Sequence, residues 1–312
     1  MNNNHNLKIM SFNIAAETLC LNNNSQIIVQ IVKSVNPDIL GIQEINCHNE
    51  TTNEYTNSNL YEQISKTMKY FYKLNENTHT AIFSKLPISD TSPKFKGIIV
   101  KRNNDLIGVF NIHLTDEPYQ PYQIAKIPYG DYPFVNSETE AIEYAKNARS
   151  KTIQDLLAEI KFTKEKYNLS TIIILGDFNE PSHRDWTTQM ANISIHPFKI
   201  EFPSVKYFED NGFVDSFRHV YPNPLTNNGF TWPTPNKYSV KETLEDRIDY
   251  ILVKSKNMKI IDADIIGEKE FKIWPSDHRA CVCILSPNSK DYYEKYVKYK
   301  LKYFKLKKHL KN

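Results

Sequence analysis

The chain has 312 residues, of which 40% are hydrophobic and 24% are charged, a composition that excludes a disordered protein. With only 8 glycines, a collagen-like or glycine-rich architecture is excluded as well. Residues 290–312 hold nine lysines and two acidic residues, a net charge of +7. Because the whole chain carries +3, residues 1–289 carry −4. We therefore expect a slightly acidic body over 1–289 and a separate basic tail over 290–312.

The four cysteines are too few and too scattered to predict a disulfide framework, and no Cys/His spacing is typical of a zinc site. Cys281 and Cys283 lie in an apolar run and are predicted to be buried thiols of a reducing compartment. No stretch reaches the roughly 18 apolar residues of a membrane span. No signal-peptide core follows the asparagine-rich N-terminus. These features predict an intracellular, soluble protein without a transmembrane segment.

Short apolar strands alternate with helical segments along the chain. The strands are predicted at residues 8–14, 39–43, 80–84, 98–101, 107–114, 171–175, 248–253 and 279–285. Residues 172–175 are apolar without alternation, which is typical of a strand buried on both faces. Strands of this kind in two packed sheets, with helices outside, predict a single layered α/β domain.

Two helices and one irregular segment complete the pattern. A helix is predicted at 27–35, and a longer one at about 137–161, where Ser137 and Glu140 form a capping box. Between residues 114 and 137, four prolines and four tyrosines exclude a regular helix or a central strand. A loop of this length usually has a functional or covering role. Its tyrosines are expected either to line a pocket or to cover a sheet edge.

Polar side chains gather where the predicted strands end. In open α/β folds, ligands bind outside the carboxyl ends of the strands, so residues far apart in sequence can converge there. Carboxylate and amide oxygens suit hard cations such as Mg²⁺ or Mn²⁺ better than zinc. A hard cation beside imidazoles and carboxylates is suited to phosphoester hydrolysis. The residues concerned are Asn13, Gln43, Glu44, His113, Asp177, Asn179, Asp249, Asp277 and His278.

These residues lie in motifs that together resemble the endonuclease/exonuclease/phosphatase superfamily. This fold group includes pancreatic deoxyribonuclease, abasic-site endonucleases, neutral sphingomyelinases and inositol-polyphosphate 5-phosphatases. The resemblance implies a four-layer α/β/β/α sandwich with two mixed β-sheets, and a catalytic domain over 1–289. The motifs are Ser-Phe-Asn (11–13), Gln-Glu (43–44), His-Leu (113–114), Gly-Asp-Phe-Asn-Glu-Pro (176–181), Arg-Ile-Asp-Tyr (247–250) and Ser-Asp-His-Arg (276–279).

The resemblance also assigns roles to the principal site residues. It implies that Glu44, with help from Asn13 and Asp277, holds the divalent metal. His278 is then either the general base for the attacking water or the group that faces the phosphate. Asp249 fixes the tautomer of the His278 ring.

Three further positions follow from the same resemblance. Asp177 and Asn179 are implied to position the nucleophile, the scissile phosphate and a possible second metal. His113 matches the second active-site histidine of the deoxyribonuclease and sphingomyelinase branches, which argues against an abasic-site enzyme. The acidic partner of this histidine is not readable, and Glu76 is a candidate by position only.

Several other residues are weaker candidates for substrate binding. Trp232, Tyr119 and Tyr122 are candidates for stacking on a substrate ring, although packing explains such residues equally well. Arg247 is a candidate phosphate ligand, but we favour a structural pairing with a nearby carboxylate.

The tail has apolar residues at heptad-like spacing on a basic segment, which predicts an amphipathic helix. It resembles a lysine- and tyrosine-rich extension found in proteins of giant amoeba viruses, and this implies a viral protein of the host cytoplasm or the virion. Packing, self-association, contact with nucleic acid or acidic membranes, and a solvated appendage all remain open for it. The apolar positions are Tyr292, Tyr296, Tyr299, Tyr303, Leu306 and Leu310.

We expect a metal-dependent phosphoesterase, and within that class a nuclease-like phosphodiesterase. The alternatives are a small-molecule or lipid-headgroup phosphatase, similar to a sphingomyelinase, and a non-catalytic binding module. The charge of −4 on residues 1–289 offers no broad basic surface, which disfavours a nonspecific nuclease that acts through the body alone. Nucleic acid therefore remains an open partner.

Overall fold

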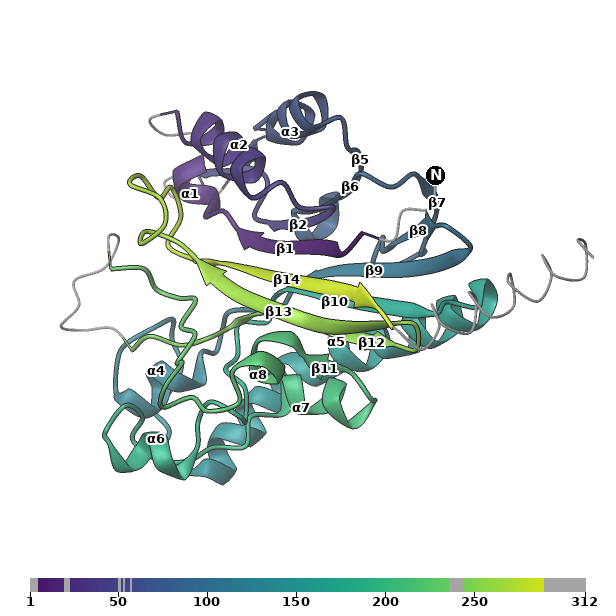
Figure 1. Ribbon diagram of the computed structural model, residues 1–312. Coiled ribbons are helices and arrows are strands. Elements are labelled where there is room, and N and C mark those ends of the chain that lie inside the picture. Colours follow the sequence, from purple (N-terminus) through teal and green to yellow (C-terminus); the bar gives the residue numbers. More distant parts are fainter. Residues whose placement is uncertain are drawn as a thin grey trace, which may run out of the picture.

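The computed structural model describes residues 5–19, 23–49, 52, 54–56, 58–235 and 244–288. Two six-stranded mixed sheets pack face to face, and helices cover their outer faces (Figure 1). This arrangement confirms the predicted four-layer α/β/β/α sandwich. The tail lies outside the described residues, so its predicted helix stays a prediction.

The first sheet has the strand order β13-β14-β1-β2-β6-β5. Its strands are β13 (Met258–Ile266), β14 (Ala280–Pro287), β1 (Leu7–Asn13), β2 (Ile39–Gln43), β6 (Thr80–Ser84) and β5 (Phe71–Asn75). The helices α1 (Ala16–Leu19), α2 (Asn24–Val35) and α3 (Leu60–Met68) lie on its outer side. A short hairpin of β3 (Cys47–Asn49) and β4 (Glu54–Thr56) follows β2, and a 3-10 turn, Glu76–Thr78, joins β5 to β6.

The second sheet has the order β11-β12-β10-β9-β8-β7. Its strands are β11 (Val214–Asp215), β12 (Asp249–Ser255), β10 (Thr171–Asp177), β9 (Asp105–His113), β8 (Ile98–Arg102) and β7 (Ile88–Thr91). The helices on this side are α4 (Gln120–Ala125), α5 (Glu138–Tyr167), α6 (Thr188–Asn192), α7 (Pro203–Asp210) and α8 (Ser216–Val220). None of the helices in the described ranges is both long and apolar enough to span a membrane.

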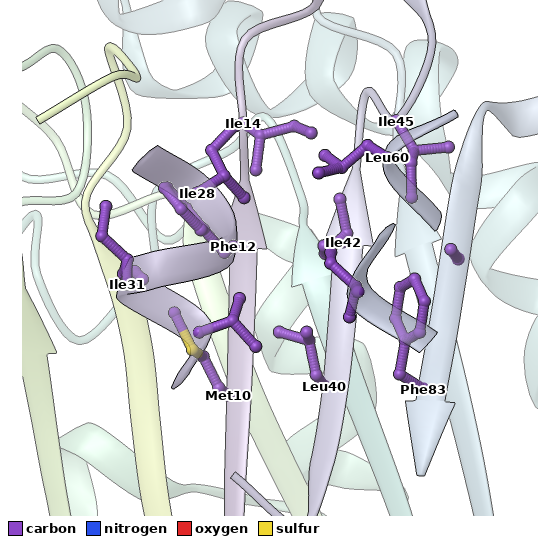
Figure 2. Packing of buried hydrophobic residues seen from close by; sticks show 14 of the residues in the cluster. Met10, Phe12, Ile14, Ile28, Ile31, Leu40, Ile42, Ile45, Leu60 and Phe83 are labelled. Carbon is purple, nitrogen blue, oxygen red and sulfur yellow. The ribbon is translucent and has the colours of Figure 1, made fainter. Parts of the chain in front are cut away.

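Three apolar layers follow from the alternation of side chains along the central strands. On β1, Ile9 faces the second sheet, whereas Met10 and Phe12 pack under the outer helices, as Figure 2 shows for Met10 and Phe12. On β10, Ile173 joins the layer between the sheets and Ile174 packs toward α5 and α7. The prediction that residues 172–175 are buried on both faces is confirmed.

The parallel strand pairs bring the polar strand ends together. β1 runs parallel to β2, with Asn13 paired to Gln43, and β10 runs parallel to β9, with Asp177 paired to His113. β12 runs antiparallel to β10, which places Asp249 beside Asp177. Since the carboxyl ends of parallel strands share one edge of a sheet, four of the predicted site motifs meet at one end of the sandwich.

Two expectations need correction. Within the proline-rich segment, α4 does form a short helix, because Pro121 stands in its first turn, where proline is tolerated. Cys281 and Cys283 are free and buried, as predicted. Cys47, however, is disulfide-bonded, which counts against the predicted reducing compartment.

Candidate active site

A histidine and a carboxylate form a buried pair at the start of β12 and just before β14. His278 Nδ1 lies 2.9 Å from Asp249 Oδ2, which fixes the ring and leaves Nε2 directed toward Asp177 Oδ2, 3.8 Å away. Burial lowers the pKa of His278, but the Asp249 and Asp177 carboxylates outweigh burial and raise it above its usual range. The pair therefore stabilises an imidazolium.

Asp177 occupies the centre of the site, at the end of β10. Burial raises the pKa of its carboxyl, and the negative charge of Asp249 raises it further. Its Oδ1 accepts a hydrogen bond from the Asn179 backbone N–H at 2.8 Å, which is the local turn that aspartate favours. Preceding Gly176 has φ +145°, and a Cβ there would lie 1.9 Å from the Ile112 carbonyl oxygen, so glycine is required at this strand end.

Asn13 links the central aspartate to the acidic residue after β2. Its Nδ2 donates to Glu44 Oε1 and to Asp177 Oδ2, both at 2.9 Å, while its Oδ1 accepts from the Ala15 N–H. Glu44 Oε2 accepts a second hydrogen bond, from the Ala16 N–H at 2.7 Å. In this arrangement Asn13 orients the two carboxylates through its Nδ2.

His113, at the end of β9, faces the same two carboxylates. Its Nε2 lies 3.7 Å from Glu44 Oε1 and 3.7 Å from Asp177 Oδ2. These two carboxylates are therefore its acidic neighbours, whereas Glu76 lines an adjoining hollow. Two imidazoles, those of His113 and His278, thus lie close to the same carboxylate oxygen of Asp177.

A buried amide bridge holds the two sheets together behind the site. Gln43 Nε2 donates to Asn111 Oδ1 at 2.6 Å, and Asn111 Nδ2 donates in turn to the carbonyls of Ile42 and Ala81 at 2.8 Å. These bonds connect β2 and β6 to β9. They keep the strand ends of both sheets in fixed relative positions.

The site residues line a cavity of about 340 Å³. Five carboxylates border it, and no lysine or arginine occurs among the described residues that line it. A larger hollow of about 530 Å³ surrounds Arg279 and includes none of the predicted site residues. Of those predicted residues, the smaller cavity contacts Glu44, His113, Tyr119, Asp177, Asn179, Trp232, Asp277 and His278.

One wall of the cavity is a cluster of aromatic rings. Tyr119 packs edge-on against Trp232, with ring centroids 5.4 Å apart, and the Trp232 Nε1–H donates to Asp277 Oδ2 at 3.1 Å. Tyr122 is buried behind these two rings and does not border the cavity. The segment after β9 therefore lines a pocket, one of the two roles expected for its tyrosines.

Two arginines near the motifs lie buried away from the cavity. Arg247 Nε donates to Asp185 at 3.0 Å and its terminal nitrogen pairs with Asp215 at 2.7 Å, as the structural interpretation predicts. Arg149 of α5 donates to the carbonyls of Thr115, Asp116 and Pro118. Arg247 therefore stabilises the core beneath the site, and Arg149 fixes the aromatic wall.

Sequence reasoning missed the opposite wall. His48 and Tyr55 come from the β3–β4 hairpin and His79 from the turn before β6, and all three border the cavity. The surrounding sequence is rich in Asn and Thr and has no apolar alternation, so it gave no signal of a strand pair.

The donor set fits a hard divalent cation. Asp177, Asp249 and His278 offer ligand atoms that lie within 4.8 Å of one another, and Asn13 bridges Glu44 to Asp177. Asp249 Oδ1 is buried and has no hydrogen-bond partner among the described residues, which leaves an oxygen lone pair free to accept. Carboxylate oxygens with an imidazole suit magnesium-like ions more than soft metals.

The chain belongs to the endonuclease/exonuclease/phosphatase family, whose model matches residues 10–278. The protein F14F9.5 of Caenorhabditis elegans is 29% identical over 297 residues, which cover 88% of this chain and 89% of that protein.

Solved structures share the fold at low sequence identity. Truncated TDP2 from Caenorhabditis elegans has a TM-score of 0.55 at 16% identity, covering 92% of this chain and 100% of that chain. The 3′-5′ exonuclease NExo from Neisseria meningitidis has a TM-score of 0.55 at 18% identity, covering 89% of this chain and 98% of that chain. An AP endonuclease from Archaeoglobus fulgidus has a TM-score of 0.52 at 19% identity, covering 89% of this chain and 98% of that chain.

Proposed function

We propose that the protein is a divalent-metal-dependent phosphodiesterase that hydrolyses its substrate with an activated water. The observation that carries the proposal is the continuous contact series Asp249–His278–Asp177–His113, with Glu44 beside it. Its last three members and Glu44 line one cavity. Every member of the series comes from a different motif, so chance juxtaposition is a poor explanation. Family membership supports the same reaction class.

His278 acts as the general base in this proposal. Its Nδ1 is engaged by Asp249, so the Nε2 atom is the one that accepts the proton of water. The Asp249 and Asp177 carboxylates raise the pKa of the ring, so a bound cation that offsets their charge is needed to leave Nε2 unprotonated for this role, and the same carboxylates then stabilise the imidazolium that forms. The water oxygen forms a bond to phosphorus, the ester P–O bond breaks, and the departing oxygen takes a proton from solvent.

Asp177 and Asn179 position the water and the scissile phosphate, and His113 faces the phosphoryl oxygens from the other side. Glu44, Asp177 and Asp277 would hold the cation in this proposal, and His278 would not, because its ring is engaged by Asp249 and its Nε2 serves as the base. Asn13 orients Glu44. A bound Mg²⁺ or Mn²⁺ supplies charge neutralisation at the phosphoryl oxygens. With these roles, every predicted catalytic residue lies at or next to one cavity.

The acidic cavity favours a small phosphoester over a long polynucleotide. Glu17, Asp116 and Asp277 add to the charge of Glu44 and Asp177, and proteins that grip many phosphates need clustered lysine and arginine. A small-molecule or lipid-headgroup phosphodiester is therefore the substrate class that the cavity favours, and nucleic acid is the other candidate. The aromatic wall of Tyr119 and Trp232 can contact a substrate of either class.

Turnover of bis-(4-nitrophenyl) phosphate with Mg²⁺ or Mn²⁺ tests the proposal. We expect hydrolysis that excess chelator abolishes, and a loss of about 10² to 10⁴-fold in kcat for His278→Ala, the range for a general acid–base residue. His219→Ala is a matched control, because His219 lies exposed on α8, outside the cavity. Full activity in chelator, or in His278→Ala, would overturn the proposal.

A further inference from the structure

The two members of the catalytic pair come from different sheets. His278 lies two residues before β14 of the first sheet, and Asp249 is the first residue of β12 in the second sheet. The 2.9 Å contact between their side chains therefore depends on how the ends of these two strands are placed relative to each other. Thr231, which is fully buried and lies outside the strands of both sheets, contacts both strand ends.

The hydroxyl of Thr231 holds the Asp249 side of the pair. Thr231 Oγ1 accepts hydrogen bonds from the backbone N–H of Asp249 at 3.2 Å and from that of Ile248 at 3.0 Å. The Asp249 carboxylate contacts His278 through Oδ2, whereas its Oδ1 has no hydrogen-bond partner among the described residues. The position of this carboxylate therefore depends on the Asp249 backbone, which the Thr231 hydroxyl contacts directly.

The main chain of Thr231 holds the His278 side of the pair. Its carbonyl oxygen accepts a hydrogen bond at 2.7 Å from the N–H of Arg279, the residue that follows His278. Its own N–H donates to the Asp246 carbonyl oxygen at 2.9 Å, in the segment that leads into β12. One residue thus joins the start of β14 to the start of β12, at the level of the catalytic pair.

Thr231 is not one of the described residues that line the reaction cavity, although its neighbour Trp232 is. Its effect on the reaction must therefore pass through the residues that it holds. His278 borders the cavity, and Asp249 engages its Nδ1. A general base must lie within hydrogen-bond reach of the water that it deprotonates, so a misplacement of about 1 Å is costly.

We propose that Thr231 is a positioning residue for the reaction. Its hydroxyl holds Asp249 so that the His278 ring keeps the orientation in which Nε2 is directed toward Asp177. The inference rests on the proposed function for the role of His278 as the general base. A hydroxyl that only satisfies two buried N–H groups would affect the stability of the fold but not the catalytic pair.

Two substitutions of Thr231 test the role of its hydroxyl. Thr231→Val keeps the shape of the side chain but removes the acceptor, and Thr231→Ser keeps the hydroxyl. For bis-(4-nitrophenyl) phosphate we expect kcat to fall about 10 to 100-fold in Thr231→Val with little change in KM, because the residues that line the cavity are intact. Thr231→Ser should retain kcat near the wild-type value.

Thr171→Val is the matched control. Thr171 is also buried, and its Oγ1 lies 2.6 Å from Ser255 Oγ, but it is the first residue of β10, at the opposite end of the strand from Asp177. This variant loses a buried hydrogen bond and should keep the wild-type kcat. An equal fall in kcat in Thr171→Val or in Thr231→Ser would overturn the positioning role, as would wild-type kcat in folded Thr231→Val.

A spectroscopic measurement separates failure of the positioning role from failure of the proposed function. The Asp249 carboxylate is an acceptor, so Nδ1 of His278 carries the proton between the two groups. This buried proton should give a downfield NMR resonance that is missing in His278→Ala. We expect the resonance to be lost or shifted in Thr231→Val, and to be kept in Thr231→Ser and Thr171→Val.

The measurement needs no turnover, so it applies even if the wild-type protein hydrolyses nothing. Thr231→Ala, which also lacks the hydroxyl but has a smaller side chain, replaces Thr231→Val if that variant fails to fold. A wild-type resonance in a folded protein without the Thr231 hydroxyl would overturn the inference.

Discussion

At the scale of single residues, Arg247 illustrates why a motif does not assign a role. It stands two residues before Asp249, within the Arg-Ile-Asp-Tyr motif, and sequence alone permits either a phosphate ligand or a structural pairing. The structure buries its guanidinium between Asp185 and Asp215. Arg218 shares Asp185, so four charged side chains form one buried network. A phosphate ligand and a structural residue are distinguished here only by the burial of Arg247 and by the identity of its partners. Both depend on the tertiary fold.

Replacing Arg247 should therefore affect stability more than catalysis. Arg247→Met leaves Asp215 without the guanidinium that pairs with it and leaves Asp185 with Arg218 alone, and breaking a buried ion pair on one side costs about 3–5 kcal/mol. Urea unfolding of Arg247→Met beside Lys259→Met, an exposed control, measures the difference. Folded Arg247→Met protein should keep wild-type kcat/KM. Lost turnover at unchanged stability would show instead that Arg247 contacts the substrate.

At the scale of elements, periodic apolar patterns predicted the strands but not the short elements of the rim. β2 and β6 have the predicted bounds, because their apolar runs end at polar residues. The helix predicted at 137–161 is α5, which extends to Tyr167, and Ser137 caps it by accepting from the Glu140 N–H. The β3–β4 hairpin lacked any such pattern, although it supplies Tyr55 to the cavity.

The segment between β9 and α5 is held as a wall by one side chain of α5. Arg149 donates to three carbonyls of residues 115–118 and to the Gln120 side chain at 2.8 Å. The Tyr119 hydroxyl also donates to buried Asp246 at 2.9 Å. The prolines and tyrosines predicted an irregular segment with a functional or covering role, but the arginine that fixes it lies some thirty residues away and could not be found from sequence spacing.

Loss of Arg149 should release this wall. Arg149→Met removes the donors of the Thr115 and Asp116 carbonyls and one of the two donors of the Pro118 carbonyl, which also accepts from Gln120. The cost is about 1–3 kcal/mol for each group that is left unsatisfied. Limited proteolysis should then cut within residues 118–135 faster than in the wild-type protein. Lys146→Met, on the exposed side of the same helix, provides the comparison. Equal cleavage rates in the two variants would contradict the anchoring role.

At the scale of the whole molecule, the charge of the chain belongs to two different parts. Part of the −4 on residues 1–289 comes from the carboxylates that border the reaction cavity, and a bound cation offsets some of it. The catalytic domain over 1–289, the roles of the basic tail, the viral origin and the intracellular location stay predictions. The order of the motifs along the sequence predicted the sandwich fold. It also predicted that the site residues converge, because the strand ends in this fold meet at one edge.

The central claim is that a divalent cation held beside Asp177 supports phosphodiester hydrolysis, and a metal titration of turnover tests it most directly. Wild-type protein freed of metal should be inactive on bis-(4-nitrophenyl) phosphate and should regain activity with saturable dependence on Mg²⁺ or Mn²⁺. In Glu44→Gln, which keeps the side-chain shape but loses the charge, half-maximal activity should require about 10 to 100-fold more metal. Turnover that is independent of added metal, or an identical titration curve for Glu44→Gln, would contradict the account.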